Sequence, residues 1–130
     1  MDSCIFCKII KNEIPSEKIY ENKDFLAFLD INPVNHGHLL IIPKEHVEWM
    51  QDADDKIVRE IFKLAKHLML AMKKSFECDY VQVSVVGTDV PHFHVHLIPR
   101  YLNDGHGSFS TKKYKDREMA EVAQKIKSNL

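Results

Sequence analysis

The sequence predicts an α+β domain with a five-stranded antiparallel sheet, a long crossover helix and a C-terminal helix, in which all the helices pack on one face of the sheet. Five short segments rich in β-branched and apolar residues are separated by turns, and a 3.6-residue apolar period runs over 55–77. No Gly-rich strand-to-helix turn occurs, which argues against a doubly wound α/β fold. A length of 130 residues fits a single domain.

The first third of the chain is expected to form a short helix and then three strands. Apolar residues of the first segment share one helical face, and a polar turn containing Asn22 and Asp24 joins the first two strands in a hairpin. Pro43 stops the third strand. The expected elements are a helix over 4–11 and strands over 18–21, 25–31 and 38–42.

The remainder adds a long amphipathic helix, two neighbouring strands and a final helix. Asp54 or Asp55 is the expected N-cap of the long helix, because a carboxylate there accepts hydrogen bonds from free backbone N–H groups. The expected elements are helices over 55–77 and 116–127, strands over 80–87 and 91–100, and a loop over 103–111.

Composition excludes several classes of protein. The net charge of −1 gives no general attraction to nucleic acid or to an anionic membrane, and no apolar run is long enough to span a bilayer. Three cysteines, with no secretion signal, indicate reduced thiols rather than a disulfide framework, and Cys78 is expected to be a small buried side chain. We therefore expect a cytoplasmic protein that binds neither nucleic acid nor membrane.

The segment PHFHVHLIPR, over 91–100, contains three of the eight histidines in strict alternation with apolar residues. Successive side chains of a strand point to opposite faces, so His92, His94 and His96 are expected on one face, with Phe93 and its apolar companions on the other. Imidazole titrates near neutral pH and acts as a nucleophile, a proton carrier or a metal ligand. Chemistry is therefore expected on the histidine face.

Four motifs in order resemble those of the histidine triad (HIT) family of nucleotide-binding proteins and hydrolases. They are CIFCKII at 4–10, AFLDINP at 27–33, GHLLIIPKEH at 37–46 and HFHVHLI at 92–98. The resemblance covers about residues 4–101, and a C-terminal loop and helix over 102–130 complete the single domain. It implies a homodimer that acts on nucleoside 5′-phosphoryl compounds without an organic cofactor.

The resemblance also implies that His94, the middle histidine, is the nucleophile. A neutral imidazole attacks phosphorus, and the phosphoryl-imidazole is labile enough to hydrolyse, so one hard displacement becomes two easier ones. His96 and His38 would flank the phosphate and stabilise charge on the transferred group. Nucleoside phosphoramidates and dinucleoside polyphosphates are both candidate substrates, although the segment after Arg100 is longer than in the short-tailed phosphoramidase branch.

The nucleotide itself is expected to bind through AFLDINP and the first helix. Asp30 is the candidate for the ribose hydroxyls, because a carboxylate accepts two hydrogen bonds and the family keeps an acid at this place. The residues expected to form an apolar slot for the base are Phe6, Ile9, Phe28 and Ile31. Such a slot discriminates poorly between bases, so no base preference is predicted.

Cys4 and Cys7 form a C-x-x-C that would face one side of a helix, and His46 and His92 are available to complete a Cys2His2 tetrahedron. A closed set of four ligands predicts structural zinc. Some members resembling this chain bind zinc in this way while others lack the cysteines, so the metal would take no part in the family's chemistry. A redox-active thiol pair is less favoured because no strand leads into the motif.

One segment departs from the family pattern. Many members have Gly-Gln-Ser or Gly-Gln-Thr before the triad, whose side chains contact the phosphate and leaving group, whereas this chain has Gly87-Thr-Asp-Val-Pro91. Thr88 and Asp89 are candidate substitutes, although a carboxylate beside an anionic substrate is unfavourable unless it points away. Arg100 is expected either to supply compensating positive charge or to form a surface salt bridge.

Two other functions also fit the residues. Three histidines on one face would hold a catalytic zinc with an open position, with Asp89 and Asp30 as carboxylate candidates, although no H-E-x-x-H motif is present. The altered loop before the triad instead favours a nucleotide-binding or scaffolding protein with little turnover. As the family suggests, the helix over 55–77 and the strand after it are expected to form the two-fold interface of a homodimer.

Overall fold

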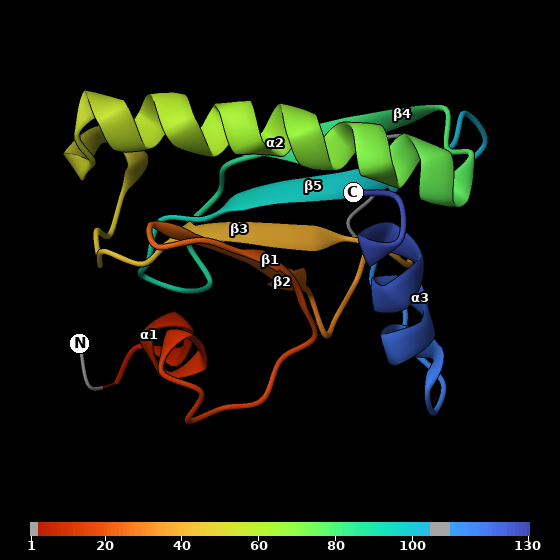
Figure 1. Ribbon diagram of the computed structural model, residues 1–130, viewed down its shortest axis with the longest axis horizontal. Coiled ribbons are helices and arrows are strands. Elements are labelled where there is room, and N and C mark those ends of the chain that lie inside the picture. The colour runs from red at the N-terminus through yellow and green to blue at the C-terminus, as the bar shows by residue number, and fades with distance from the viewer. Residues whose placement is uncertain (1–2, 105–109) are drawn as a thin grey trace.

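The computed structural model describes residues 3–104 and 110–130. A five-stranded antiparallel sheet of order β1-β2-β3-β5-β4 forms its centre (Figure 1). The strands are β1 (Lys18–Glu21), β2 (Phe25–Leu29), β3 (Leu39–Pro43), β4 (Tyr80–Ser84) and β5 (Val95–Arg100). The predicted α+β class and the antiparallel sheet are confirmed. Residues 105–109 of the predicted loop lie outside the described residues.

The helices lie on both faces of the sheet (Figure 1). They are α1 (Ile5–Ile10), the 3-10 turn η1 (Met50–Asp52), α2 (Asp55–Phe76) and α3 (Glu118–Lys127). The expectation that all helices share one face is wrong, because α1 covers the face opposite α2 and α3. The reason lies in two of the three inner strands. Every residue of β2 (FLAFL) and β3 (LLIIP) is buried, so both faces of the sheet need an apolar cover.

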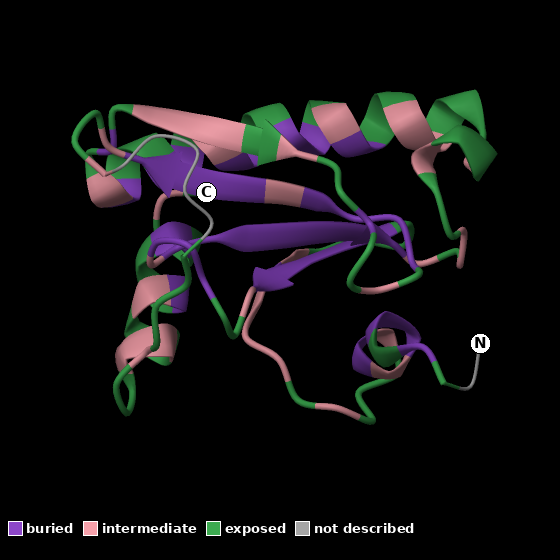
Figure 2. Ribbon diagram, turned by 180° about the vertical axis from the view of Figure 1, so that it is seen from behind, coloured by how far each residue is buried: buried purple, intermediate pink, exposed green. Residues whose placement is uncertain are grey.

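The main core lies between the sheet and the helices α2 and α3, and Figure 2 shows the buried central strands. Leu68 and Met72 of α2 pack there against Leu39 and Leu97 of the sheet. Asp54 is the N-cap of α2, since its Oδ1 accepts a hydrogen bond from the Ile57 N–H at 2.9 Å. No helix in the described ranges is long and apolar enough to cross a bilayer.

The last two strands are shorter than the sequence pattern predicts. β4 ends at Ser84 and β5 begins at Val95, so the intervening residues 85–94 form a loop. In that loop Pro91 has no N–H to donate, and the Phe93 N–H bonds to the carbonyl of Val47 instead of to a neighbouring strand. Among the three triad histidines, His96 alone belongs to a strand, although Phe93, Val95 and Leu97 do pack in the main core as predicted.

The segment before α3 is attached to the loop between β2 and β3. The Lys112 N–H donates to the carbonyl of Pro33 at 2.7 Å, and the Gly37 N–H donates to the Tyr114 hydroxyl at 2.8 Å. The His36 ring stacks on Tyr114 with 4.5 Å between ring centroids. The C-terminal part of the chain therefore supports the loop that leads into His38.

Candidate functional site

Two adjoining pockets open where β2, β3 and β5 meet the loop 85–94. The first, called here the histidine pocket, has a volume of about 360 Å³ and is lined by His38, His96, Thr88 and Thr111 among others. The second, the apolar pocket, has a volume of about 260 Å³ and lies between α1 and β2. Asp30 and Asp89 border both pockets.

His38 and His96 form a hydrogen-bonded pair whose tautomers follow from the backbone. The Val34 N–H donates to Nδ1 of His38 at 3.1 Å, so the proton of neutral His38 is on Nε2. That Nε2–H donates to Nδ1 of His96 at 2.9 Å, which places the His96 proton on its own Nε2. Burial lowers the pKa of His38 to about 3 and that of His96 to about 4. Both rings are therefore neutral at neutral pH.

His94 presents an unshared lone pair to the site. Its Nδ1 lies 2.7 Å from the carbonyl oxygen of His92, so Nδ1 is the protonated, donating nitrogen and Nε2 carries the lone pair. The ring is 1% exposed, and Nε2 has no hydrogen-bond partner among the described residues. The nearest charged atom is Oδ1 of Asp89, at 3.4 Å from Nε2. This geometry is that of an oriented imidazole nucleophile.

The residues predicted to bind the nucleotide also lie together. The apolar pocket is lined by Phe6, Ile9, Phe28 and Ile31, with Asp30 at its border with the histidine pocket. Phe6 stands edge-on to Phe28 at 5.5 Å and to His94 at 5.0 Å between ring centroids. Burial raises the pKa of Asp30, while the Asn32 N–H bond to its carboxylate opposes that rise. The arrangement offers an apolar slot with a carboxylate at its mouth.

Thr88 and Asp89 both lie at the opening of the histidine pocket, and Arg100 does not. Arg100 is 1% exposed and forms a two-contact ion pair with Asp104, at 2.8 Å from Nε and 3.0 Å from Nη2. The guanidinium also lowers the pKa of Asp104 to about 2. Arg100 therefore does form the expected salt bridge, but inside the fold and not at the surface, because a buried guanidinium needs a carboxylate partner; the expectation that its charge serves the pocket is wrong.

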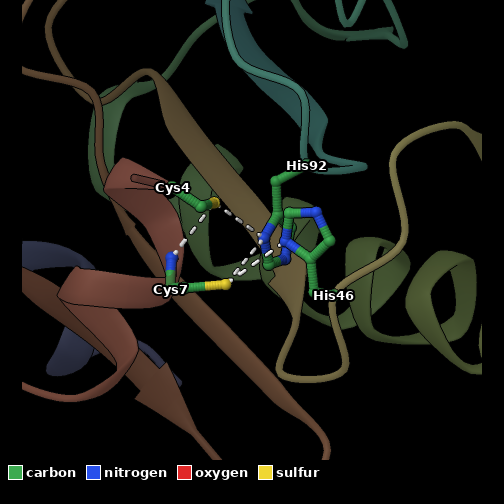
Figure 3. Close-up of side chains that lie close together, drawn as sticks. All are labelled: Cys4, Cys7, His46 and His92. Carbon is green, nitrogen blue, oxygen red and sulfur yellow. Dashed lines mark hydrogen bonds between the residues drawn. The ribbon is translucent and has the colours of Figure 1, made fainter. Parts of the chain in front are cut away.

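The two cysteines converge with two histidines on the α1 side of the sheet. Figure 3 shows Cys4 and Cys7 at the start of α1 facing His46, from the loop after β3, and His92, from the loop before β5. Nδ1 of His92 lies 3.3 Å from Cys4 Sγ and 3.6 Å from Cys7 Sγ, and Nδ1 of His46 lies 3.3 Å from Cys7 Sγ. Cys4 is the N-cap of α1 rather than a residue of its first turn.

This cluster fits a tetrahedral metal ion. Zn–S and Zn–N bonds of ordinary length place the sulfur and nitrogen ligands about 3.6 Å apart, close to the distances between these atoms. His92 donates from Nε2 to the carbonyl of Pro43 at 2.8 Å, which leaves Nδ1 as the ligand atom and orients the ring.

All three cysteines are free and buried, including Cys78, as predicted.

The same geometry separates His92 from the other two triad histidines. Its ligand nitrogen faces the thiols, whereas Asp89, His94 and His96 form a different group. The three histidines therefore do not share one metal position, because the loop over 85–94 turns His92 away from the histidine pocket. The catalytic zinc site expected as an alternative, with three histidines on one strand face, is not formed.

A family model described as the HIT domain matches residues 11–103. The chain belongs to the HIT family. As a HIT protein it is similar to an adenosine 5′-monophosphoramidase of Saccharomyces cerevisiae, with 44% identity over 99 residues, which cover 75% of this chain and 63% of the relative.

Solved HIT structures agree with the fold over nearly the whole chain. A Hit-like protein of Bartonella henselae has a TM-score of 0.85 and 34% identity, covering 100% of this chain and 98% of the other. A zinc-bound histidine triad family protein of Mycobacterium smegmatis has a TM-score of 0.84 and 28% identity, covering 98% and 93%. The resemblance found in the sequence motifs is thereby confirmed.

Several groups at the site are not among the sequence predictions. The Val34 N–H, the His92 carbonyl and the Pro43 carbonyl fix which nitrogen each histidine exposes. Backbone groups are present at every position, so no residue type marks them in a sequence. Thr111 lines the histidine pocket from beyond the motif-bearing region, and only the fold brings it there.

Proposed function

We propose that this protein is a nucleotide hydrolase or transferase that attacks the α-phosphorus of nucleoside 5′-phosphoryl compounds through His94. The observation that carries the proposal is the unshared Nε2 lone pair of a buried, oriented imidazole beside two further neutral histidines. Candidate substrates are phosphoramidates and dinucleoside polyphosphates. The similarity to a yeast adenosine 5′-monophosphoramidase supports the reaction class.

The first step forms a bond between His94 Nε2 and phosphorus and breaks the bond from phosphorus to the leaving group. The leaving group departs with the bonding electron pair and takes a proton from solvent in the open pocket, while the Nε2–H of neutral His96 is available to donate a hydrogen bond to the transferred group. The His92 carbonyl accepts a hydrogen bond from the positively charged His94 ring as charge develops. In the second step, water attacks phosphorus and gives a proton to solvent, and the bond from phosphorus to His94 Nε2 breaks, which releases the monophosphate and free His94.

The nucleotide would lie with its base in the apolar pocket and its ribose at Asp30. Phe6 packs edge-on against both Phe28 and His94, so a base held there brings the 5′-phosphate toward the nucleophile. His38 Nε2 lies 3.7 Å from Asp30 Oδ2. It also donates to Nδ1 of His96, which keeps the His96 proton on Nε2. We assign His38 to positioning of His96, and His96 with Thr88 to contact with the phosphate.

The direct test is release of adenosine monophosphate from an adenosine phosphoramidate. His94→Ala is expected to lose at least about a thousandfold in kcat/KM, because the intermediate has no other nucleophile. His67→Ala is the matched control, since His67 is an exposed histidine of α2 that contacts Tyr20 and lines neither pocket. Equal activity of wild type and His94→Ala would contradict the proposal, and tight nucleotide binding without turnover would favour the binding-protein function.

We further propose that Cys4, Cys7, His46 and His92 hold one structural zinc ion. The four ligand atoms lie within 4.8 Å of one another, and the zinc-bound relative of Mycobacterium smegmatis supports the metal. Zinc there would join α1 to the loops on either side of the triad, and all four protein ligands would close the site to substrate. No organic cofactor enters the proposal.

We also propose that the chain forms a homodimer through β4 and α2. β4 is an edge strand, and Val83 in it and Val85 and Val86 directly after it are between 42% and 49% exposed, with Leu70 of α2 59% exposed. An exposed apolar edge strand is a surface that natural proteins cover.

A further inference from the structure

Asp89 brings a carboxylate next to the proposed nucleophile. Its Oδ1 lies 3.4 Å from the attacking Nε2 of His94, and its side chain is 62% exposed, whereas the His94 side chain is fully buried. The carboxylate borders both the histidine pocket and the apolar pocket. A substrate phosphorus bound against Nε2 therefore has a carboxylate within a few ångströms, on the side that is open to solvent.

The leaving group has one direction in which to extend. With the base in the apolar pocket and the ribose at Asp30, the rest of the substrate passes into the histidine pocket, past Ser84, Thr88 and Thr111. Asp89 stands at the boundary where the bond to phosphorus breaks. The part of the leaving group nearest phosphorus is then the part that meets this carboxylate.

Positive charge to offset Asp89 is scarce at the site. Among the described residues that line the two pockets, none is a lysine or an arginine. His38 and His96 are neutral at neutral pH, because burial lowers the pKa of His38 to about 3 and that of His96 to about 4. The guanidinium of Arg100 is bound to Asp104 and does not line either pocket.

We infer that Asp89 makes this protein prefer substrates whose leaving group carries a positive charge close to phosphorus, such as phosphoramidates of diamines. This inference rests on the function proposed above. An ammonium group about 5 Å from the carboxylate in a partly exposed site is worth about tenfold in kcat/KM over a neutral group of the same size. A polyphosphate leaving group adds negative charge at the same point and is disfavoured.

The test compares two adenosine phosphoramidates that differ in one charge, made from ethylenediamine and from ethanolamine. The ratio of their kcat/KM values is measured in wild type and in Asp89→Asn, which keeps the shape of the side chain and removes its charge. Because both proteins see the same pair of substrates, differences in intrinsic reactivity between the two amines cancel. Glu60→Gln is the matched control, since it removes one exposed carboxylate of α2 that lines neither pocket.

We expect the ratio of cationic to neutral substrate to be about tenfold higher in wild type and Glu60→Gln than in Asp89→Asn, and to shrink as salt is added. An equal ratio in all three proteins, with turnover intact, would overturn the inference and leave the proposed function standing. If wild type turns over neither compound, the proposed function fails. The charge preference is then read from the dissociation constants of the two compounds, and equal constants for wild type would overturn it.

Discussion

The histidines of this site acquire different properties from the backbone groups they contact. His94 donates to a carbonyl and exposes Nε2, whereas His38 accepts from an N–H and uses Nε2 as a donor. His92 donates to the Pro43 carbonyl and turns Nδ1 to the thiols. The roles proposed for these three imidazoles, as nucleophile, positioning group and metal ligand, follow from these different contacts.

The pH dependence of stability is predicted from His38. An unfolded histidine titrates near pH 6.5, whereas burial and the neighbouring rings of His96 and His94 lower the pKa of folded His38 to about 3. Between these values the unfolded chain binds more protons. The free energy of unfolding therefore falls as the pH falls from about 6.5 toward 3, by at most about 1.4 kcal/mol per pH unit from this group. Above pH 6.5 the group contributes no slope.

Urea unfolding of wild type and His38→Asn between pH 7 and pH 4.5 measures this contribution. The variant is expected to lose less stability over that range, because it lacks the buried neutral imidazole. Asp30, whose Oδ2 lies 3.7 Å from His38 Nε2, and the four proposed zinc ligands are present in both proteins, so their titration cancels in the comparison to first order. Parallel pH dependences in the two proteins would exclude His38 as the cause.

The proposed zinc site gives a second prediction for single residues. Purified protein should contain about one zinc ion per chain, and Cys7→Ser should lower that content strongly and reduce the melting temperature. Cys78→Ala is the control, since it removes the third buried thiol without touching the cluster and should leave the zinc content unchanged. Chelated, zinc-free wild type with an unaltered melting temperature would argue against a structural ion.

Residue types in a motif were sufficient to predict which side chains meet at the site, but not their orientation. The Cys4, Cys7, His46 and His92 cluster and the Phe6 and Phe28 pocket follow from motif and spacing. The separate orientation of His92 does not, because it depends on where β5 begins and on a backbone carbonyl. The ion-pair partner of Arg100 could not be predicted either, because Asp104 meets Arg100 only through the turn that follows β5.

Among the secondary-structure elements, the loop between β2 and β3 connects the two halves of the site, because it joins Asp30 to His38. Gly37 has a φ of +97°, and a Cβ atom there would lie 2.5 Å from the Phe76 ring at the end of α2. Only glycine satisfies both the backbone conformation and the close approach. The C-terminal segment adds the Tyr114 hydroxyl as acceptor for the Gly37 N–H.

Gly37→Ala is therefore expected to destabilise the protein by about 2–4 kcal/mol, through backbone strain and overpacking against Phe76. Phe76→Leu in the same chain should recover the part caused by the clash and leave the part caused by the positive φ. Denaturant unfolding of the single and double variants measures both parts. A Gly37→Ala protein as stable as wild type would show that the loop relaxes without cost.

The elements themselves were predictable to different degrees. The long helix α2 was predictable from its own apolar period, and its observed end at Phe76 differs by one residue from the predicted range 55–77. The sequence of α1 alone does not predict on which face of the sheet this six-residue helix packs, because that depends on which face the other helices leave uncovered. The evidence for that face is in the continuous apolar runs of β2 and β3, which indicate strands buried on both sides.

For the whole molecule, the position of β4 at the end of the sheet leads to a prediction about assembly. Val83→Lys should convert the proposed dimer into a monomer, because an added charge on an edge strand opposes pairing with a second copy. Leu130→Lys adds the same charge at another exposed apolar residue, at the C-terminus, and should leave the dimer intact. Light scattering measures the molar mass of wild type and of the two variants in solution. A monomeric wild type would refute the proposed interface.

The central claim is that His94 is transiently bonded to the nucleotide. Intact-protein mass spectrometry after rapid, acid-free quenching with an adenosine phosphoramidate tests it most directly, because phosphoryl-imidazole bonds are acid-labile. We predict a mass increase of one adenylyl group in wild type and in His67→Ala, and none in His94→Ala. An adduct that persists in His94→Ala, or monophosphate release from wild type without any adduct at any time, would contradict the claim.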